Sequence, residues 1–284
     1  MKQFKARVIS NKVLLRYPGT KYYLMDLVVD NECGEFMPGQ FIMLKCGGDT
    51  LLRRPISVHS VLSDQVIEIL YALSSGNQSA TPCPHESSES RFSLEKGKTL
   101  LSQLKKGKEI DIIGPLGNGY TIDDTSKSLL LVAGGIGIAP LRFLAERASS
   151  LGKSVNLLMG AKYYGGLYPR SLLPETINVV SIVENISRHS HYLKGLVTDL
   201  LLQYMGNCDQ VFACGPVAMY QTISDKLKKS AVDKPVQISL EVRMGCGFGL
   251  CYGCSIKTRQ GMKRVCKDGP VFKIKDIIWE EVKL

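Results

Sequence analysis

The sequence predicts an antiparallel β-barrel, then an α/β domain with a parallel sheet, and finally a small cysteine-rich segment. Three patterns predict this: short β-type segments in the first part, alternating strands and helices in the second, and four cysteines close together near the end. The 284 residues are enough for about two compact domains. We expect the divisions 1–125, 126–234 and 235–284.

The first part of the chain contains several short segments that are rich in β-branched and aromatic residues, with Gly, Pro, Asn and Asp between them. This pattern is typical of strands in a small barrel or sandwich. The clearest of these segments are Lys5–Leu15, Tyr22–Val29, Gln40–Leu44 and Val66–Leu73. The serine-rich residues Ser74 to Ser93 interrupt the pattern, and we expect an exposed loop there.

After Asp124 the pattern changes to apolar runs that alternate with helical stretches. Such alternation predicts a parallel sheet with helical crossovers. The expected strands are Ser128–Val132, Val155–Met159, Val179–Val183 and Gln210–Ala213. The expected helices are Pro140–Ser150, Leu196–Met205 and Pro216–Ser230.

Composition and charge exclude several classes of protein. The net charge is +10, but Lys and Arg are spread along the chain, so we expect no nucleic-acid binding. Residues Met1 to Leu15 lack the apolar core of a signal peptide. The most apolar stretch, Leu129 to Leu141, is shorter than the roughly 20 residues that a membrane span needs. We therefore predict a cytoplasmic protein without a membrane span.

Four of the nine cysteines lie close together, at Cys246, Cys251, Cys254 and Cys266. Without a secretory signal, such a group more often binds metal than forms disulfides. The first three follow the C-x4-C-x2-C spacing of plant-type ferredoxins, and the glycines between them let backbone N–H groups approach the sulfurs. The spacing favours a 2Fe–2S cluster. The alternative is a four-cysteine zinc site, although zinc ligands usually come as two separated pairs.

Two turns follow expected strands and precede expected helices. The first contains Gly134, Gly135 and Gly137 and ends at Pro140, a residue that suits the first turn of a helix. Glycines let the backbone approach a pyrophosphate, whose charge a helix N-terminus favours. The second turn is Cys214-Gly215-Pro216. By itself, each turn is also compatible with an ordinary strand–turn–helix connection.

A third motif, Arg53-Arg54-Pro55-Ile56-Ser57, combines guanidinium groups with a hydroxyl. A guanidinium can neutralise a diphosphate, and a hydroxyl can bond to the edge of a flavin ring. The same residues could also form an ordinary polar surface turn. A cluster of turn residues, Gly114-Pro-Leu-Gly117-Asn-Gly119, follows later in the chain.

The order of these motifs resembles that of ferredoxin–NADP reductase-like flavoproteins. The cysteine segment and the ending Arg264–Phe272 narrow the resemblance to the electron-transfer subunits of NAD-dependent dihydroorotate dehydrogenases, over nearly the whole chain. The resemblance implies a FAD-binding barrel, a dinucleotide-binding domain and an iron–sulfur segment. At two positions this chain departs from the usual residue: Ala72 replaces an arginine, and Lys98 replaces a threonine.

The resemblance also implies which residues contact each cofactor. For FAD these would be Arg54, Pro55, Ile56 and Ser57, the strand residues Leu70, Tyr71 and Ala72, and the phosphate turn Gly97, Lys98 and Thr99. For NAD(H) they would be Gly134, Gly135, Gly137 and Pro140, with Cys214, Gly215 and Pro216 near the nicotinamide. The cluster ligands would be Cys246, Cys251, Cys254 and Cys266.

The function implied by the resemblance is an electron relay in pyrimidine biosynthesis. FAD would stand between the two-electron nicotinamide and the one-electron cluster. The partner would be an FMN-containing catalytic subunit that converts dihydroorotate to orotate, in an assembly of two copies of each subunit. We expect no catalytic acid–base residue in this chain. The alternatives are the small subunit of a ferredoxin–NADP transhydrogenase, sulfide dehydrogenase or sulfite reductase, or a zinc-stabilised interaction module.

Overall fold

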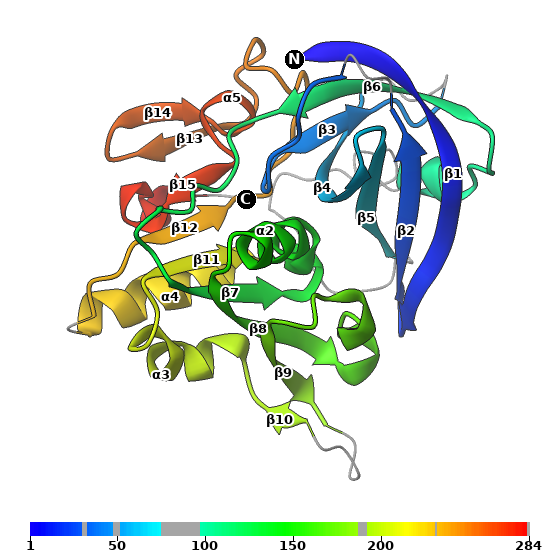
Figure 1. Ribbon diagram of the computed structural model, residues 1–284. Coiled ribbons are helices and arrows are strands. Elements are labelled where there is room, and N and C mark those ends of the chain that lie inside the picture. Colours follow the sequence, from blue (N-terminus) through cyan, green and yellow to red (C-terminus); the bar gives the residue numbers. More distant parts are fainter. Residues whose placement is uncertain (30–32, 48–51, 75–96, 187–191, 231, 283–284) are drawn as a thin grey trace.

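The computed structural model describes residues 1–29, 33–47, 52–74, 97–186, 192–230 and 232–282. Nearly all of the expected loop from Ser74 to Ser93 lies outside these residues. In Figure 1 the barrel lies at upper right, the sheet of the α/β domain lies below it, and the cysteine-rich segment lies at upper left.

The N-terminal part forms a closed barrel in the order β1-β2-β5-β4-β3-β6, and every strand pair in it is antiparallel. Alternate residues of these strands fill the interior, as the two-residue period of a strand requires. The antiparallel barrel is therefore confirmed. The six strands are β1 (Lys2–Tyr17), β2 (Thr20–Val28), β3 (Phe41–Leu44), β4 (Arg54–Ser63), β5 (Val66–Ser74) and β6 (Glu109–Leu116).

The second part forms a seven-stranded sheet in the order β10-β9-β8-β7-β11-β12-β15. All of its pairs are parallel except that between β12 and β15. The α/β prediction is therefore confirmed. The strands are β7 (Ser128–Gly134), β8 (Ser154–Tyr163), β9 (Asn178–Asn185), β10 (Leu193–Lys194), β11 (Gln210–Cys214), β12 (Val236–Ser239) and β15 (Val271–Lys273).

Helices cover both faces of this sheet. Helix α2 (Ile138–Ser150) packs on the face turned to the barrel, whereas α3 (Leu201–Met205) and α4 (Val217–Lys229) pack on the other. The expected helix at Leu196–Met205 begins as a 3-10 turn, Val197–Leu200. The alternating residues of β7 supply both cores, since Leu129 and Leu131 face α2 while Leu130 and Val132 face α3 and α4.

The C-terminal segment is continuous with the sheet. It contributes β12 and β15 to the sheet, and between them it forms the hairpin of β13 (Ser255–Thr258) and β14 (Gly261–Arg264) and the short helix α5 (Val265–Asp268). Because β12 pairs with β11, a division at residue 234 separates neighbouring strands of one sheet. The three divisions of the chain stay a prediction.

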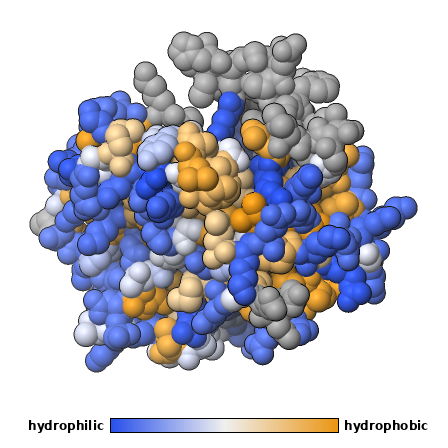
Figure 2. Space-filling model, turned by 90° about the horizontal axis from the view of Figure 1, so that it is seen from above, coloured by the Kyte–Doolittle hydropathy of each residue, from blue (hydrophilic) through white to orange (hydrophobic). Residues whose placement is uncertain are grey.

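One face of the molecule is mostly hydrophilic. In Figure 2 blue residues cover most of this face, and orange residues lie among them in separate patches. Within the described ranges, no helix is both long enough and apolar enough to cross a bilayer. The cytoplasmic location stays a prediction.

Candidate functional site

The two adjacent arginines of the third motif have different surroundings. Arg53 forms an ion pair of 2.9 Å with the carboxylate of Asp111 in β6. Arg54 is buried at the start of β4, where its Nη1 donates to the carbonyl of Leu52 over 2.7 Å. A β-carbon placed on Gly97 would lie only 2.7 Å from Nε of Arg54. The structure thus places the arginine and the glycine turn side by side, as a shared phosphate site requires.

Strand geometry divides the remaining predicted flavin residues between two faces. In β4, Ile56 points into the barrel core, so Pro55 and Ser57 point outwards. In β5 the Tyr71 side chain also lies in the barrel core, where its hydroxyl donates to Oδ1 of Asn11 over 3.0 Å. Leu70 and Ala72 face the other way, towards the core of the α/β domain. The outward face between barrel and sheet is therefore lined by the neighbours of Tyr71 and not by its ring.

The two strand–helix turns of the α/β domain contact each other closely. A β-carbon at Gly137 would lie 1.9 Å from the carbonyl oxygen of Cys214, and one at Gly134 would lie 2.9 Å from Cδ of Pro216. Strands β7 and β11 are paired in parallel, so both turns lie at the carboxyl edge of the sheet. This edge is where open α/β sheets bind their ligands.

Cys214 is held as a neutral thiol. Its side chain is 1% exposed, and burial, followed by the charge of Glu241, raises the pKa of the thiol well above its usual range. The Tyr220 hydroxyl accepts from the Gly215 N–H over 2.9 Å and donates to the Ser239 carbonyl over 2.6 Å. These two hydrogen bonds hold the turn in place, and the neutral thiol of Cys214 is unreactive.

Sequence analysis missed Glu241, which follows β12 at the same edge of the sheet. The Glu241 side chain is exposed to solvent. Partial desolvation by the neighbouring protein nevertheless raises the pKa of its carboxyl, and the positive charge of Lys98 opposes this rise. The charge of Glu241 also contributes to raising the pKa of Tyr22 in the barrel. Ser239 pairs with Cys214 of β11, and Glu241 lies two residues further along the chain. This position, close to the predicted Cys214 turn, is the signal that could have revealed Glu241.

The four C-terminal cysteines lie close together. Cys246 interacts with Cys251, and Cys266 interacts with both Cys254 and Cys246. Burial raises the pKa of Cys246, but hydrogen bonds from the backbone N–H groups of Cys251, Phe248 and Leu250 outweigh it and lower that pKa to about 6. The Cys266 N–H also points at the sulfur of Cys254 over 3.4 Å.

This arrangement suits a binuclear cluster. Four soft sulfur donors that lie close together, approached by backbone N–H groups, match the four-thiolate ligation of two irons in a 2Fe–2S cluster. The residues present therefore fit that group.

The cysteine loop packs against the strand that pairs with the flavin motif. A β-carbon at Gly247, whose φ is +85°, would lie 2.5 Å from Cγ of Met43 in β3. Met43 is itself the register partner of Pro55 in β4. On its other side the loop is open, because Cys251 is exposed while Cys254 and Cys266 are buried.

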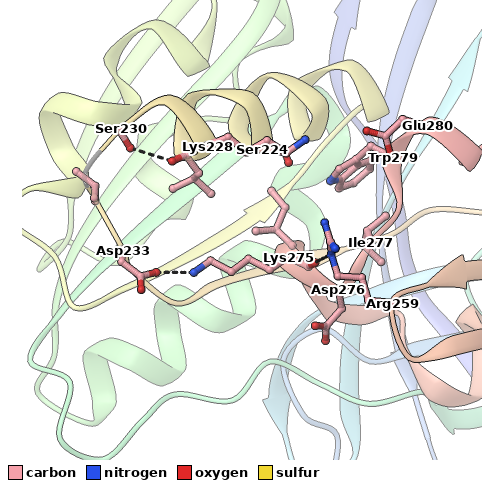
Figure 3. Close-up of a pocket in the computed structure, with 13 residues that line it drawn as sticks. Ser224, Lys228, Ser230, Asp233, Arg259, Lys275, Asp276, Ile277, Trp279 and Glu280 are labelled. Carbon is pink, nitrogen blue, oxygen red and sulfur yellow. Dashed lines mark hydrogen bonds and ion pairs between the residues drawn. The ribbon is translucent and has the colours of Figure 1, made fainter.

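A separate cavity of about 540 Å³ lies between the end of α4 and the C-terminal residues. Figure 3 shows Trp279 and Lys275 on its walls and the ion pair between Lys275 and Asp233. None of the predicted cofactor-binding residues lines this cavity.

Comparison with known proteins decides the family. Residues 241–278 match the iron-sulfur cluster binding domain of dihydroorotate dehydrogenase B, and residues 131–225 match the oxidoreductase NAD-binding domain. A dihydroorotate dehydrogenase B (NAD(+)) electron transfer subunit from Caldanaerobacter subterraneus is 32% identical over 98% of this chain and 99% of its own length. The chain belongs to this family. The family's subunit from Clostridium perfringens is 34% identical, over 96% of both chains.

Solved structures show the same fold beyond the family. An NADH-dependent reduced ferredoxin–NADP oxidoreductase superposes with a TM-score of 0.74 at 22% identity, over 97% of this chain and 90% of the other. The ferredoxin–NADP⁺ reductase of Plasmodium falciparum gives a TM-score of 0.61 at 14% identity, over 83% and 96%. The resemblance to reductase-like flavoproteins and to dihydroorotate dehydrogenase electron-transfer subunits is confirmed.

Proposed function

We propose that this chain relays electrons between NAD(H) and the FMN of a dihydroorotate dehydrogenase catalytic subunit, through FAD and a 2Fe–2S cluster, in pyrimidine biosynthesis. The observation that carries the proposal is that the cysteine loop packs on the barrel strand next to the flavin motif, within a chain of this family. Bound FAD supplies the exchange between two-electron hydride chemistry and one-electron transfer. The chain's own residues bind and orient the cofactors.

Each cofactor has a set of residues suited to its charge. Arg54 and the Gly97-Lys98-Thr99 turn would neutralise the FAD diphosphate, and the outward faces of β4 and β5 would receive the flavin through Pro55, Ser57, Leu70 and Ala72. The paired turns at Gly134–Pro140 and Cys214–Pro216 would receive NAD(H). Only the Tyr22 hydroxyl, at 3.7 Å, lies within 4 Å of the β-carbon position of Gly135, so a dinucleotide can approach the turn before α2 closely there.

We expect Arg54→Lys to release FAD while Arg53→Lys retains it. Lysine keeps the charge but loses the planar fork that can bind two phosphate oxygens. The loss of one charge-assisted hydrogen bond, about 1.5–3 kcal/mol, corresponds to roughly 10- to 100-fold weaker FAD binding. The FAD-to-protein ratio after gel filtration measures this. Equal FAD loss from both variants would remove Arg54 from the site.

The partner is a catalytic subunit, as the name of the family's chains implies. We propose that it carries FMN, that two copies of each subunit assemble, and that it docks over the exposed side of the cysteine loop. Two large apolar side chains flank Cys251 there, with Leu250 at 73% and Tyr252 at 65% exposed. The guanidinium of Arg264 lies 5.0 Å from the Tyr252 ring centre and holds the ring in place.

Leu250→Glu should weaken association with the catalytic subunit by about tenfold or more, because a carboxylate would be buried against an apolar surface. Its NADH-dependent FAD reduction and its iron content should not change. Leu62→Glu is the matched control, since Leu62 is 51% exposed in β4 and remote from the loop. Analytical ultracentrifugation of the mixed subunits measures both, and equal affinities would contradict the docking site.

The function is tested by anaerobic co-purification with the native partner subunit, cofactor analysis, and an assay of dihydroorotate-dependent NAD⁺ reduction. We expect FAD, iron and sulfide with this chain, and activity only in the complex. A colourless protein containing zinc would support the interaction-module alternative instead. Co-purification with a sulfide- or ferredoxin-oxidising partner would support one of the related complexes.

A further inference from the structure

A buried histidine connects the flavin strand to the dinucleotide turn. His59 lies in β4, two residues after Ser57, where a β-bulge interrupts the pairing with β5, and its bond to α2 shows that the ring faces out of the barrel. Its Nδ1 lies 2.7 Å from the carbonyl oxygen of Ala139, in the first turn of α2 and next to Pro140. Residues two apart in a strand are separated by about 7 Å. The His59 imidazole therefore connects β4, next to the proposed flavin site, with α2, next to the proposed NAD(H) site.

The partners of His59 fix its protonation state. A carbonyl oxygen can only accept, so Nδ1 carries the proton and donates to Ala139. The Tyr168 hydroxyl lies 2.9 Å from Nε2 and must therefore donate to it. The ring is fully buried, and burial, reinforced by the charge of Arg142, lowers the pKa of His59 to about 3. The ring is thus a neutral donor–acceptor bridge with a single tautomer.

Charged groups from both domains surround this bridge and hold it in place. Arg142 in α2 forms ion pairs of 3.1 Å with Glu68 in β5 and 3.0 Å with Glu146 in α2, and its Nε donates to the Leu172 carbonyl. The Ser60 hydroxyl in β4 donates to Glu146 over 2.7 Å. Glu68 and Ser60 of the barrel thus bind Arg142 and Glu146 of α2, so the barrel and α2 cannot slide past each other without breaking several of these bonds.

We propose that His59 is a positioning residue for hydride transfer: its bond to Ala139 sets the distance between the flavin held on β4 and the NAD(H) held by the paired turns at Gly134–Pro140 and Cys214–Pro216. Hydride transfer needs the reacting atoms at about 3–3.5 Å, and a misplacement of 1 Å can cost about a hundredfold in rate. The proposal rests on the proposed function of these two sites.

The test compares His59→Leu with His59→Asn in the anaerobically purified complex with the catalytic subunit. The two side chains have the same shape, but only asparagine can place an N–H near the position of Nδ1 and donate to Ala139. In stopped-flow experiments with NADH, we expect the limiting rate of FAD reduction to fall roughly 10- to 100-fold in His59→Leu, with an unchanged Kd for NADH. The nicotinamide–flavin charge-transfer absorbance should also fall. His59→Asn should restore most of both.

Equal rates and equal charge-transfer bands in the two variants would overturn the proposal, because the bond to Ala139 would then make no difference. If neither the wild-type complex nor any variant is reduced by NADH, the proposed function fails instead. If His59→Leu does not fold, the ¹⁵N chemical shifts of His59 in the wild-type protein decide. A neutral ring protonated at Nδ1 is the expected result, and a ring protonated at Nε2 would contradict the bridge.

Discussion

Cys254→Ser should abolish the cluster and electron transfer to the catalytic subunit, while FAD reduction by NADH persists. Cys254 is 4% exposed and lies against Cys266, whose N–H points at its sulfur over 3.4 Å. A serine oxygen is a hard donor and replaces a soft thiolate poorly on iron. The barrel and the paired turns do not depend on this sulfur. We therefore expect the iron content and the reduced-state EPR signal to fall to background, together with dihydroorotate-dependent NAD⁺ reduction.

Cys208→Ser is the matched control for this prediction. Cys208 is just as buried, at 2% exposed, but its thiol donates to the Met205 carbonyl in the α/β domain, a bond that a serine hydroxyl can replace. This variant should keep its full iron content and activity. Iron retained at the wild-type ratio in Cys254→Ser would exclude Cys254 as a ligand, and zinc in place of iron in the wild type would exclude the cluster.

The sequence predicts the architecture because its signals are local. Strand alternation, glycine turns between strands and helices, and short cysteine spacings all depend on neighbours within a few residues. The two turns at Gly137 and Cys214 were both identified in this way, although only the structure shows that they are in contact. Parallel pairing of β7 with β11 brings them together, and pairing between distant strands leaves no mark in a single sequence.

The orientation of side chains is the part that local patterns cannot predict. Arg53 and Arg54 are chemically identical, and only the structure distinguishes them, by the ion pair of Arg53 with Asp111 and the burial of Arg54 beside Gly97. Tyr71 lies in the predicted flavin strand but points into the barrel, because its position in the strand alternation matches that of Ile69. Glu241 lies outside every recognisable motif, and only the folded structure brings its charge close to Lys98 and to Tyr22 of the barrel.

Gly137→Ala should weaken NADH binding by roughly tenfold or more, because the added β-carbon has no room. The φ of Gly137 is −58°, which any residue can adopt, but an added β-carbon would lie 1.9 Å from the oxygen and 2.3 Å from the carbon of the Cys214 carbonyl. Both atoms belong to the backbone and cannot rotate away, so one of the two turns must move. Overpacking of this kind costs about 1–3 kcal/mol. We expect a lower melting temperature and an increase of roughly tenfold or more in the Kd for NADH, with FAD and iron contents unchanged.

Gly152→Ala separates this effect from a general loss of stability. Gly152 follows α2 with a φ of +69° and has no atom within 4 Å of its β-carbon position, so alanine there is strained but displaces nothing. The left-handed conformation costs about 1–2 kcal/mol, similar to the cost expected at Gly137. The two variants should therefore have comparable stability but different Kd values for NADH, because only Gly137→Ala separates the turns at the carboxyl edge. Titration of flavin absorbance with NADH measures both Kd values, and equal values would place the dinucleotide elsewhere.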